Sequence, residues 1–266
     1  MTPQAAADAS DIDLARTTAA AAGELLAAIR AEAGDIPGDD KVALKALRDR
    51  ADGRSQELIA SRMVMAPGHE MLSEEAVDNE ARLSARRVWI IDPLDGTWEY
   101  GQGRSDWAVH IALYDTESGE MPLGVVDLPA QGLVRTSADP DAELPALPED
   151  RPLRVVASRT RPPAELDDIV ARLADRLGRE VEVVNVGSVG AKVNEILSGR
   201  AEAYLHDTGF YEWDLAAPLA VAKHYGLICD HWDGTEVVFN QMPPFVKNVF
   251  VSHPAIADEL RASLTG

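Results

Sequence analysis

The sequence predicts a protein of mixed α and β structure, with helices at the start of the chain and strands in its middle. Apolar residues recur at spacings of three and four in the first part, which is typical of helices. Runs of apolar, β-branched and aromatic residues separated by turn residues follow, and they indicate strands. In the second half, strand-like and helix-like segments alternate. With 266 residues, of which 46% are hydrophobic and 26% charged, the chain can bury a sizeable core.

Each expected element has its own signal. A first helix, capped by Ser10 or Asp11, ends at the helix breakers of residues 34–38, and a second helix covers about 41–65. The later elements are expected as strands at 88–91, 107–114, 123–128, 153–157, 181–186 and 201–205, short strands near 237 and 249, and helices at 164–177, 189–197, 215–224 and after Pro254. Residues 138–152 are acidic and contain four prolines, so we expect a connector between two lobes of about 1–140 and 150–266.

The charge balance excludes several classes of partner. The chain carries 25 Lys and Arg against 45 Asp and Glu, a net charge of −20. Such a surface repels nucleic acids and anionic membranes, so we expect neither as a partner. Small phosphates remain accessible to an acidic protein if metal ions supply positive charge.

A single cysteine, Cys229, excludes an intrachain disulfide and a Cys-rich zinc site. The N-terminus lacks the pattern of a signal peptide and no run of 18 apolar residues occurs, so we expect a cytoplasmic protein.

The strongest chemical signal lies in residues 89–97, which read Trp-Ile-Ile-Asp-Pro-Leu-Asp-Gly-Thr. Pro93 should end strand pairing at Asp92. Asp92 and Asp95 can then point into one space with the Leu94 carbonyl between them, and these are oxygen ligands that suit Mg²⁺. The backbone N–H groups that follow, in a helix or turn starting at residues 96–97, would favour a phosphate oxygen. The alternative is an ordinary Asp-capped turn.

Two further acidic elements could join this site. Glu74 follows a helix and a loop and could approach the same space, although a glutamate pair on a loop is otherwise a solvated surface. Asp214 stands at the expected start of an apolar helix, because Pro218 is tolerated in a first turn. Its alternative is a simple N-cap.

Together these motifs resemble the lithium-sensitive, magnesium-dependent phosphatases of the inositol monophosphatase superfamily. The resemblance rests on the strand-Asp-Pro-Leu-Asp-Gly-Thr segment and on Trp213-Asp214 at a later helix start, and it covers nearly the whole chain. It implies an α+β fold, a five-layer αβαβα sandwich, in one phosphatase domain over residues 1–266. It also implies two or three Mg²⁺ ions and inhibition by lithium. A homodimer is left open.

The resemblance also assigns roles to individual residues. Glu74, Asp92 and the Leu94 carbonyl correspond to the first metal site, and Asp92, Asp95 and Asp214 to the second. Thr97 and Glu74 correspond to the residues that activate the attacking water. Asp52 matches the aspartate of a family Thr-x-x-Asp motif, whose threonine position holds Asp49 in this chain. This departure leaves open whether Asp49 replaces the threonine.

A later segment points to a subfamily. Residues 187–201 and the Trp-Asp-x-x-Ala-Pro segment at 213–218 are similar to the CysQ-type bisphosphate nucleotidases, which remove the 3'-phosphate of 3'-phosphoadenosine 5'-phosphate in sulfate assimilation. The sulfated analogue is an expected second substrate. Alternatives are inositol monophosphatase, fructose-1,6-bisphosphatase or broad activity, or a metal-binding protein without catalysis. The expected substrate contacts are Asp95, Gly96, Thr97, Lys192 and Asp214. Lys192 could instead be a solvated helix lysine, and the basic loop 158–161 either contacts the nucleotide or is surface.

Overall fold

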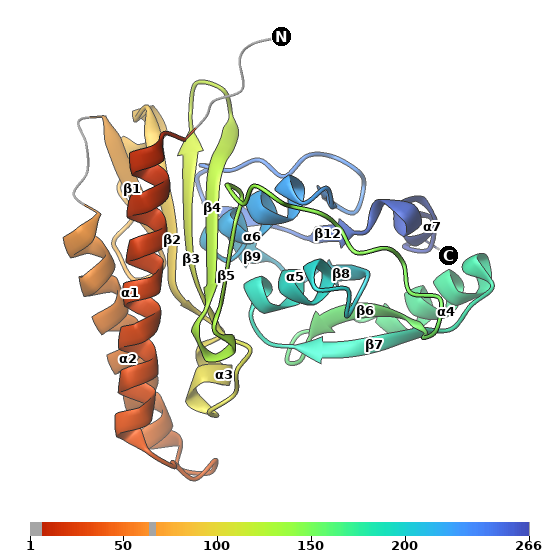
Figure 1. The fold of residues 1–266 in the computed structure, drawn as a ribbon, viewed down its shortest axis with the longest axis horizontal. Helices are drawn as coiled ribbons and strands as arrows, with labels where there is room; N and C mark the ends of the chain where they lie inside the picture. Colours follow the sequence, from red (N-terminus) through yellow and green to blue (C-terminus); the bar gives the residue numbers. More distant parts are fainter. Residues whose placement is uncertain (1–6, 64–67, 266) are drawn as a thin grey trace.

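The computed structural model describes residues 7–63 and 68–265, and it shows five layers. A helical layer, a sheet, a second helical layer, a second sheet and a third helical layer follow one another across the molecule (Figure 1). The expectation of an αβαβα sandwich is therefore confirmed.

The first two layers come from residues before the connector. Helices α1 (Ala9–Ala33) and α2 (Lys41–Arg62) pack on a five-stranded sheet. Its strands are adjacent in chain order: β1 (His69–Ser73), β2 (Arg87–Asp95), β3 (Ala108–Asp115), β4 (Glu120–Leu128) and β5 (Leu133–Thr136). Alternate residues of β2 face opposite layers, as a strand requires: Trp89 and Ile91 pack toward α1 and α2, and Val88 and Ile90 pack toward the central helices.

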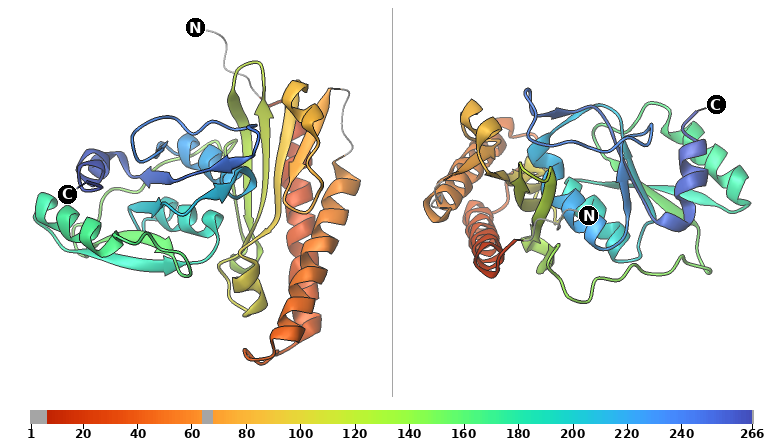
Figure 2. Two further views of the ribbon diagram at one scale, coloured as in Figure 1. Left: turned by 180° about the vertical axis from the view of Figure 1, so that it is seen from behind. Right: turned by 90° about the horizontal axis from the view of Figure 1, so that it is seen from above.

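The central and outer layers come from the second half of the chain. Helices α5 (Val189–Leu197) and α6 (Glu212–His224) lie between the two sheets (Figure 2). The second sheet has the order β10 (Ile228–Asp230), β12 (Val249–Ser252), β8 (Ala203–His206), β6 (Leu153–Ser158) and β7 (Val181–Val186). Helices α4 (Leu166–Leu177) and α7 (Ala257–Ala262) cover its outer face. The central helices therefore bury both of their faces, which explains why α6 is apolar on all sides.

Shorter elements complete the described chain. They are α3 (Thr97–Gly101), the 3₁₀ turns η1 (Glu80–Ser84), η2 (Pro129–Gln131) and η3 (Pro254–Ile256), and the strand pair β9 (Phe210–Tyr211) and β11 (Phe245–Val246). Residues 138–152 contain no helix or strand, as expected for the connector. No helix of the described chain has the length and apolar character needed to cross a bilayer.

Several expected boundaries were wrong. Asp8, and not Ser10 or Asp11, caps α1, because its carboxylate accepts from both following backbone N–H groups. Strands β1, β5 and β10 were not expected, since each is short and takes its stability from pairing with a neighbour. The expected strand near 237 is an irregular segment with one bridge, and the expected end of the second helix at 65 lies outside the described residues.

Candidate active site

The end of β2 places two carboxyl groups on one face of the first sheet. Asp92 pairs with His110 across to β3, and Asp95 pairs with Ala108, so three residues of β2 oppose two of β3. In a regular strand, residues separated by three would face opposite sides, and this one-residue bulge restores both aspartates to the same side. They face the central helices.

The expectation that β2 stops at Asp92 was therefore wrong, and Pro93 lies inside the bulge, where a residue without an N–H group is tolerated. The backbone groups that the bulge leaves unpaired find other partners. The Ser55 hydroxyl on α2 donates to the Pro93 carbonyl at 2.8 Å, and the Leu94 N–H donates to the Asp92 carboxylate at 3.0 Å. The first bond holds the Asp-Pro-Leu-Asp segment against the first helical layer, and the second fixes the shape of the segment itself.

A polar cavity of about 230 Å³ lies over this strand end. It gathers residues from both halves of the chain: Glu74, Asp92, Leu94, Asp95, Gly96, Thr97, Trp98, Glu99, Ser158, Thr160, Arg161, Gly187, Val189, Lys192, Phe210 and Asp214. Every expected metal-binding and substrate-binding residue borders this cavity. The structure thus brings together side chains that are more than a hundred residues apart, while their roles remain predictions.

Asp214 reaches the cavity from the first turn of α6. This helix begins at Glu212, three residues before the expected start, so Pro218 lies in its interior and not in its first turn. The Asp214 carboxylate accepts a hydrogen bond from the Tyr211 N–H at 2.8 Å, as a capping residue does. The N-cap of α6 is Tyr211, so the interpretation of Asp214 as the N-cap is wrong: Asp214 is the third residue of the helix, and it borders the cavity.

Desolvation and the charges of neighbouring carboxyl groups raise the pKa values of Asp92, Asp214 and Glu74 in the cavity. Burial raises the pKa of Asp92 well above its usual value, and the charges of Glu74, Asp95 and Asp214 add to this. The pKa of Asp214 rises to about 8, first through burial and then through the charge of Asp95. Solvent reaches Glu74 through the cavity, yet crowding by protein and the charge of Glu75 raise its pKa to about 7.

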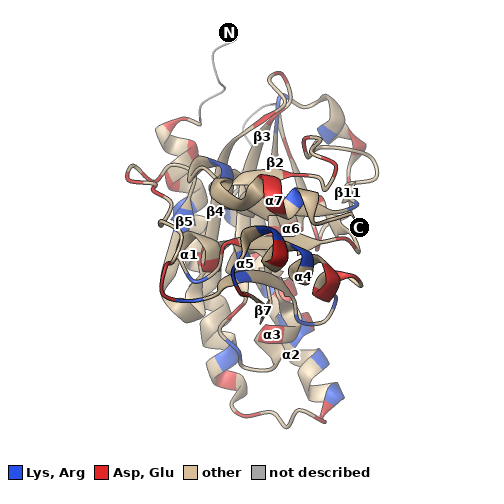
Figure 3. Cartoon of the chain, turned by 90° about the vertical axis from the view of Figure 1, so that its right-hand side faces the viewer, with Lys and Arg blue, Asp and Glu red and all other residues tan. Residues whose placement is uncertain are grey.

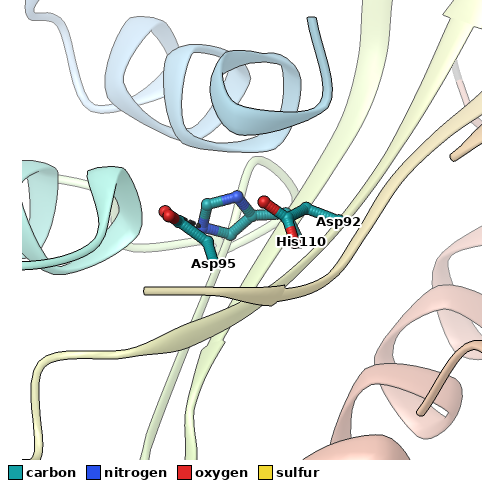
Figure 4. A group of neighbouring side chains, drawn as sticks. All are labelled: Asp92, Asp95 and His110. Carbon is teal, nitrogen blue, oxygen red and sulfur yellow. Dashed lines mark ion pairs between the residues drawn. The ribbon is translucent and has the colours of Figure 1, made fainter. Parts of the chain in front are cut away.

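This donor set fits a hard divalent cation. No Lys or Arg within the described ranges forms an ion pair with Glu74, Asp92, Asp95 or Asp214. One ligand atom from each of Asp92, Asp95 and His110 lies within 4.8 Å of the others (Figure 4). Carboxylate oxygens without a basic partner are the ligands that Mg²⁺ and similar cations prefer. The cluster is therefore a candidate metal-binding site.

Asp52 and Asp49 lie on α2, behind the cavity. Asp52 does not border it, but burial and the charge of Glu75 raise its pKa to about 7, and its charge acts in turn on Glu74. Asp49 is exposed and forms an ion pair with Lys45 one turn earlier. Of the two, Asp52 is the one whose charge acts on Glu74, whereas the charge of Asp49 acts on Asp52.

The cavity is also bordered by two basic residues, Lys192 and Arg161. Lys192 on α5 is buried, which lowers its pKa to about 8, and its ammonium donates to the Gly187 carbonyl. The interpretation of Lys192 as a solvated helix lysine is wrong. Arg161 is exposed at the cavity and lies 6.0 Å from the centre of the Phe210 ring.

The sequence did not decide whether the loop 158–161, which contains Arg161, contacts the nucleotide or lies on the surface. Its neighbour Arg159 is already engaged, because it forms ion pairs of 2.6 and 2.7 Å with Glu99 and Asp106. The sequence signal that could have placed Arg161 at the cavity is its position in the loop that directly follows the expected strand, which the structure shows as β6. His110 was also missed, because a single histidine inside an apolar strand has no motif around it.

Comparisons with known proteins agree with this geometry. The profile of the inositol monophosphatase family matches residues 8–265. A "3'-phosphoadenosine 5'-phosphate phosphatase" of Mycobacterium leprae is 40% identical over 263 residues, covering 94% of this chain and 92% of that protein. A "3'(2'),5'-bisphosphate nucleotidase CysQ" of Shigella flexneri is 30% identical over 195 residues, 70% of this chain and 76% of that protein.

Among solved structures, CysQ of Bacteroides thetaiotaomicron superimposes with a TM-score of 0.77 at 24% sequence identity. The match covers 91% of this chain and 97% of that one. At this level of identity the likeness concerns the fold, and it agrees with the five layers of Figure 1.

Proposed function

Because this chain belongs to the inositol monophosphatase family, we propose that it is a magnesium-dependent phosphatase that removes the 3'-phosphate of 3'-phosphoadenosine 5'-phosphate to leave adenosine 5'-phosphate. The sulfated analogue is the expected second substrate. The observation that carries this proposal is that one cavity combines an acidic wall suited to cations with a basic wall suited to phosphate. The acidic wall is formed by Glu74, Asp92, Asp95 and Asp214, and the basic wall by Arg161 and Lys192. The names of the relatives supply the substrate.

The acidic wall would hold the cofactor. Glu74, Asp92 and the Leu94 carbonyl would hold one Mg²⁺, and Asp92, Asp95 and Asp214 a second. Bound there, Mg²⁺ supplies positive charge that neutralises the phosphate and stabilises the leaving oxygen. This also explains how a chain with a net charge of −20 accepts an anionic substrate.

The chain's own groups would position the water. Glu74 accepts a proton from the attacking water, and the Thr97 hydroxyl orients it. Asp52, behind Glu74, adds negative charge that favours proton transfer to Glu74. The water oxygen would form a bond to phosphorus while the bond to the 3'-oxygen breaks, and the freed phosphate would keep the second proton of the water. The 3'-oxygen would take a proton from solvent, and Glu74 would return the proton it accepted to solvent. No covalent intermediate with the protein is required.

The basic wall would select a substrate with a second phosphate. Inositol 1-phosphate has one phosphate, which the cations held by the acidic wall would bind. The nucleotide also has a 5'-phosphate, which needs a separate cationic partner. Arg161 and Lys192 are the cationic side chains that border the cavity among the described residues. Binding energy at this remote phosphate can lower the barrier if it is expressed in the transition state.

Replacement of Lys192 by Ala is expected to lower kcat/KM for 3'-phosphoadenosine 5'-phosphate by about tenfold or more, the effect of losing a hydrogen bond to a charged group. Its effect on inositol 1-phosphate should be smaller, because that substrate has no second phosphate for Lys192 to bind. Parallel kinetics on both substrates measure this. Lys223→Ala, on the surface of α6, is the matched control. Equal losses on both substrates would assign Lys192 a structural role.

A substrate panel tests the whole proposal. Phosphate release is measured with Mg²⁺ and with EDTA on 3'-phosphoadenosine 5'-phosphate, its sulfated analogue, inositol 1-phosphate and fructose 1,6-bisphosphate. The proposal expects release only with Mg²⁺ and the highest kcat/KM for the first compound. A higher kcat/KM for inositol 1-phosphate would contradict the proposed substrate but not the proposed metal site. Metal binding without any turnover would contradict the proposal that the protein is an enzyme.

Nucleic acid is not an expected partner. On the face drawn in Figure 3, basic segments are separated by acidic and neutral ones over α4, α5 and α7. A nucleic-acid surface needs a continuous stripe of Lys and Arg.

A further inference from the structure

His110 is the third residue of β3, and its side chain lies beside Asp95 of the acidic wall. Its side chain is fully buried, and it is the cross-strand partner of Asp92. Because cross-strand partners share a face, the imidazole lies on the same side of the sheet as both aspartates (Figure 4). Its Nε2 atom lies 3.5 Å from Oδ2 of Asp95, and the ring also contacts the backbone of Trp213 at the start of α6.

A buried imidazole with so few partners needs a reason. Neither ring nitrogen has a close, well-oriented hydrogen bond within residues 7–63 and 68–265. Buried polar atoms without such a bond cost free energy, so a leucine at this place would pack at lower cost unless the ring contributes to the site.

The surroundings of Asp95 indicate what that contribution is. One of its oxygens, Oδ2, accepts a hydrogen bond of 2.6 Å from the Val189 N–H at the start of α5, and the same oxygen faces His110. A carboxylate offers only acceptor sites, so Nε2 can bond to it only in the tautomer that carries the hydrogen on Nε2. With the Val189 N–H and this ring both donating to Oδ2, Oδ1 would stay available to a cation.

The packing of α5 depends on this ring as well. A Cβ atom at residue 190 would lie 2.5 Å from Nε2 of His110 and 2.7 Å from Val126. Helix α5 can therefore approach the ring only because residue 190 is glycine, although glycine costs helix stability relative to alanine. Gly190 and His110 together bring the α5 N-terminus onto Asp95.

We propose that His110 is a positioning residue that donates a hydrogen bond from Nε2 to Oδ2 of Asp95 and so directs the other oxygen to the metal. The proposal deepens the proposed function, since it takes Asp95 as a metal ligand. Outer groups that orient a metal-binding carboxylate commonly change metal affinity by about 10- to 100-fold when removed.

The experiment measures Mg²⁺ binding by calorimetry without substrate, so that the result does not depend on turnover. His110→Leu should bind Mg²⁺ about 10- to 100-fold more weakly than the unchanged chain. His110→Gln, which keeps an N–H donor near the position of Nε2, should stay within about threefold of the unchanged chain, well inside one tenfold step of 1.4 kcal/mol. Gly190→Ala should weaken binding by displacing the ring, despite its better helix propensity.

His206→Leu is the matched control, because His206 is also a fully buried imidazole, stacked on Phe210 of the cavity, and its Nε2 lies 3.0 Å from the Thr208 hydroxyl. Its Mg²⁺ affinity should equal that of the unchanged chain. Circular dichroism and Tm in EDTA verify that each variant folds.

Three results would overturn the proposal. They are unchanged Mg²⁺ affinity in His110→Leu, an equal loss in His110→Gln, and a loss that is much larger for Zn²⁺ than for Mg²⁺, since imidazole prefers Zn²⁺ and that pattern marks a direct ligand. Failure of the unchanged chain to bind Mg²⁺ would overturn both this proposal and the proposal that Mg²⁺ is the cofactor. Mg²⁺ binding without phosphate release would contradict the proposed function alone, because the variants still decide the role of His110.

Discussion

Asp92 lies with Asp95 in a setting that opposes its charge, because burial and the charges of Glu74, Asp95 and Asp214 raise the pKa of Asp92 well above its usual value. Both are buried, both face the other acidic groups of the cavity, and no basic side chain of the described chain pairs with Asp92. Such repulsion weakens the folded state unless a cation relieves it. The stability and the chemistry of this cavity therefore depend on the same charges.

Asp95→Asn is expected to lower kcat of the Mg²⁺-dependent reaction by about 10²–10³, which is typical for loss of one electrostatic contributor. The side chain keeps its size, so circular dichroism should be unchanged. Phosphate release at saturating Mg²⁺ is the measurement, and Asp35→Asn, an exposed aspartate beyond α1, is the control. Near-normal turnover of Asp95→Asn would remove Asp95 from the metal site.

Asp127 is a second strained carboxyl group, remote from the cavity. Burial, and then the charge of Glu24, raise its pKa to about 7. Its carboxylate is pressed against α1, where a Cβ atom at Gly23 would lie 2.3 Å from Oδ2. In the unfolded chain Asp127 ionises near its usual pKa of 3.8, while the folded chain retains the proton up to about pH 7. Folded-state stability from this group is therefore lost as the pH rises from about 4 to 7.

Asp127→Asn should consequently increase the free energy of unfolding at pH 8, by at most about 4 kcal/mol, the equivalent of this pKa shift. The increase should shrink as the pH falls and vanish near pH 4. Urea denaturation in EDTA at pH 4, 6 and 8 measures the difference between variant and unchanged chain, which isolates Asp127 from other titrating groups. A difference independent of pH would mean that Asp127 ionises normally in the folded state.

At the level of elements, the contact of α6 with β4 determines where Asp214 lies. Gly124 on β4 permits this contact, because a Cβ atom there would lie 2.7 Å from the Ala217 carbonyl and 2.7 Å from the Ala220 side chain. A side chain at residue 124 would collide with the backbone of α6, so the whole helix would have to move away from the sheet. The small residues of α6 and Gly124 thus allow the central layer to approach the first sheet closely.

Gly124→Ala is therefore expected to destabilise the protein by about 1–3 kcal/mol, the usual cost of overpacking a core. Gly53→Ala is the matched control, because Gly53 lies within α2 with open space around it. There the better helix propensity of alanine should stabilise by up to about 1 kcal/mol. Thermal unfolding in EDTA measures both changes. Destabilisation by Gly53→Ala, or none by Gly124→Ala, would contradict this account of the packing.

At the scale of the molecule, the central helices connect two sheets built from different halves of the chain. Because α5 and α6 bury residues against both sheets, we propose that residues 1–266 form one domain whose two lobes unfold together. The cavity lies where these halves meet, since Glu74, Asp92 and Asp95 come from the first and Asp214 and Lys192 from the second.

We expect lithium to inhibit the phosphatase activity at concentrations where sodium has little effect. An acidic oxygen cage that exchanges Mg²⁺ during turnover can hold a small, hard cation in its place. Turnover is measured in matched titrations with LiCl and NaCl, because ionic strength alone weakens phosphate binding. Identical curves for the two salts would contradict this expectation.

The sequence by itself determined the order of most elements and the identity of the acidic groups. The segment at 89–97 combines a strand pattern with two carboxylates and a Gly-Thr turn, and these signals are local. The resemblance to the inositol monophosphatases rests on the same local signals, and it correctly implied the five layers.

Only the tertiary structure decided the positions that depend on pairing between distant segments. The bulge in β2 follows from its register with β3 and from Ser55 on α2, and it alone puts Asp92 and Asp95 on one face. Short strands such as β1 exist because a neighbour completes their hydrogen bonds. The contact of His110 with Asp95 likewise depends on a sheet register and on a glycine eighty positions later. A local pattern cannot encode such contacts, because register and layer packing are set by the burial of both sheets against the central helices.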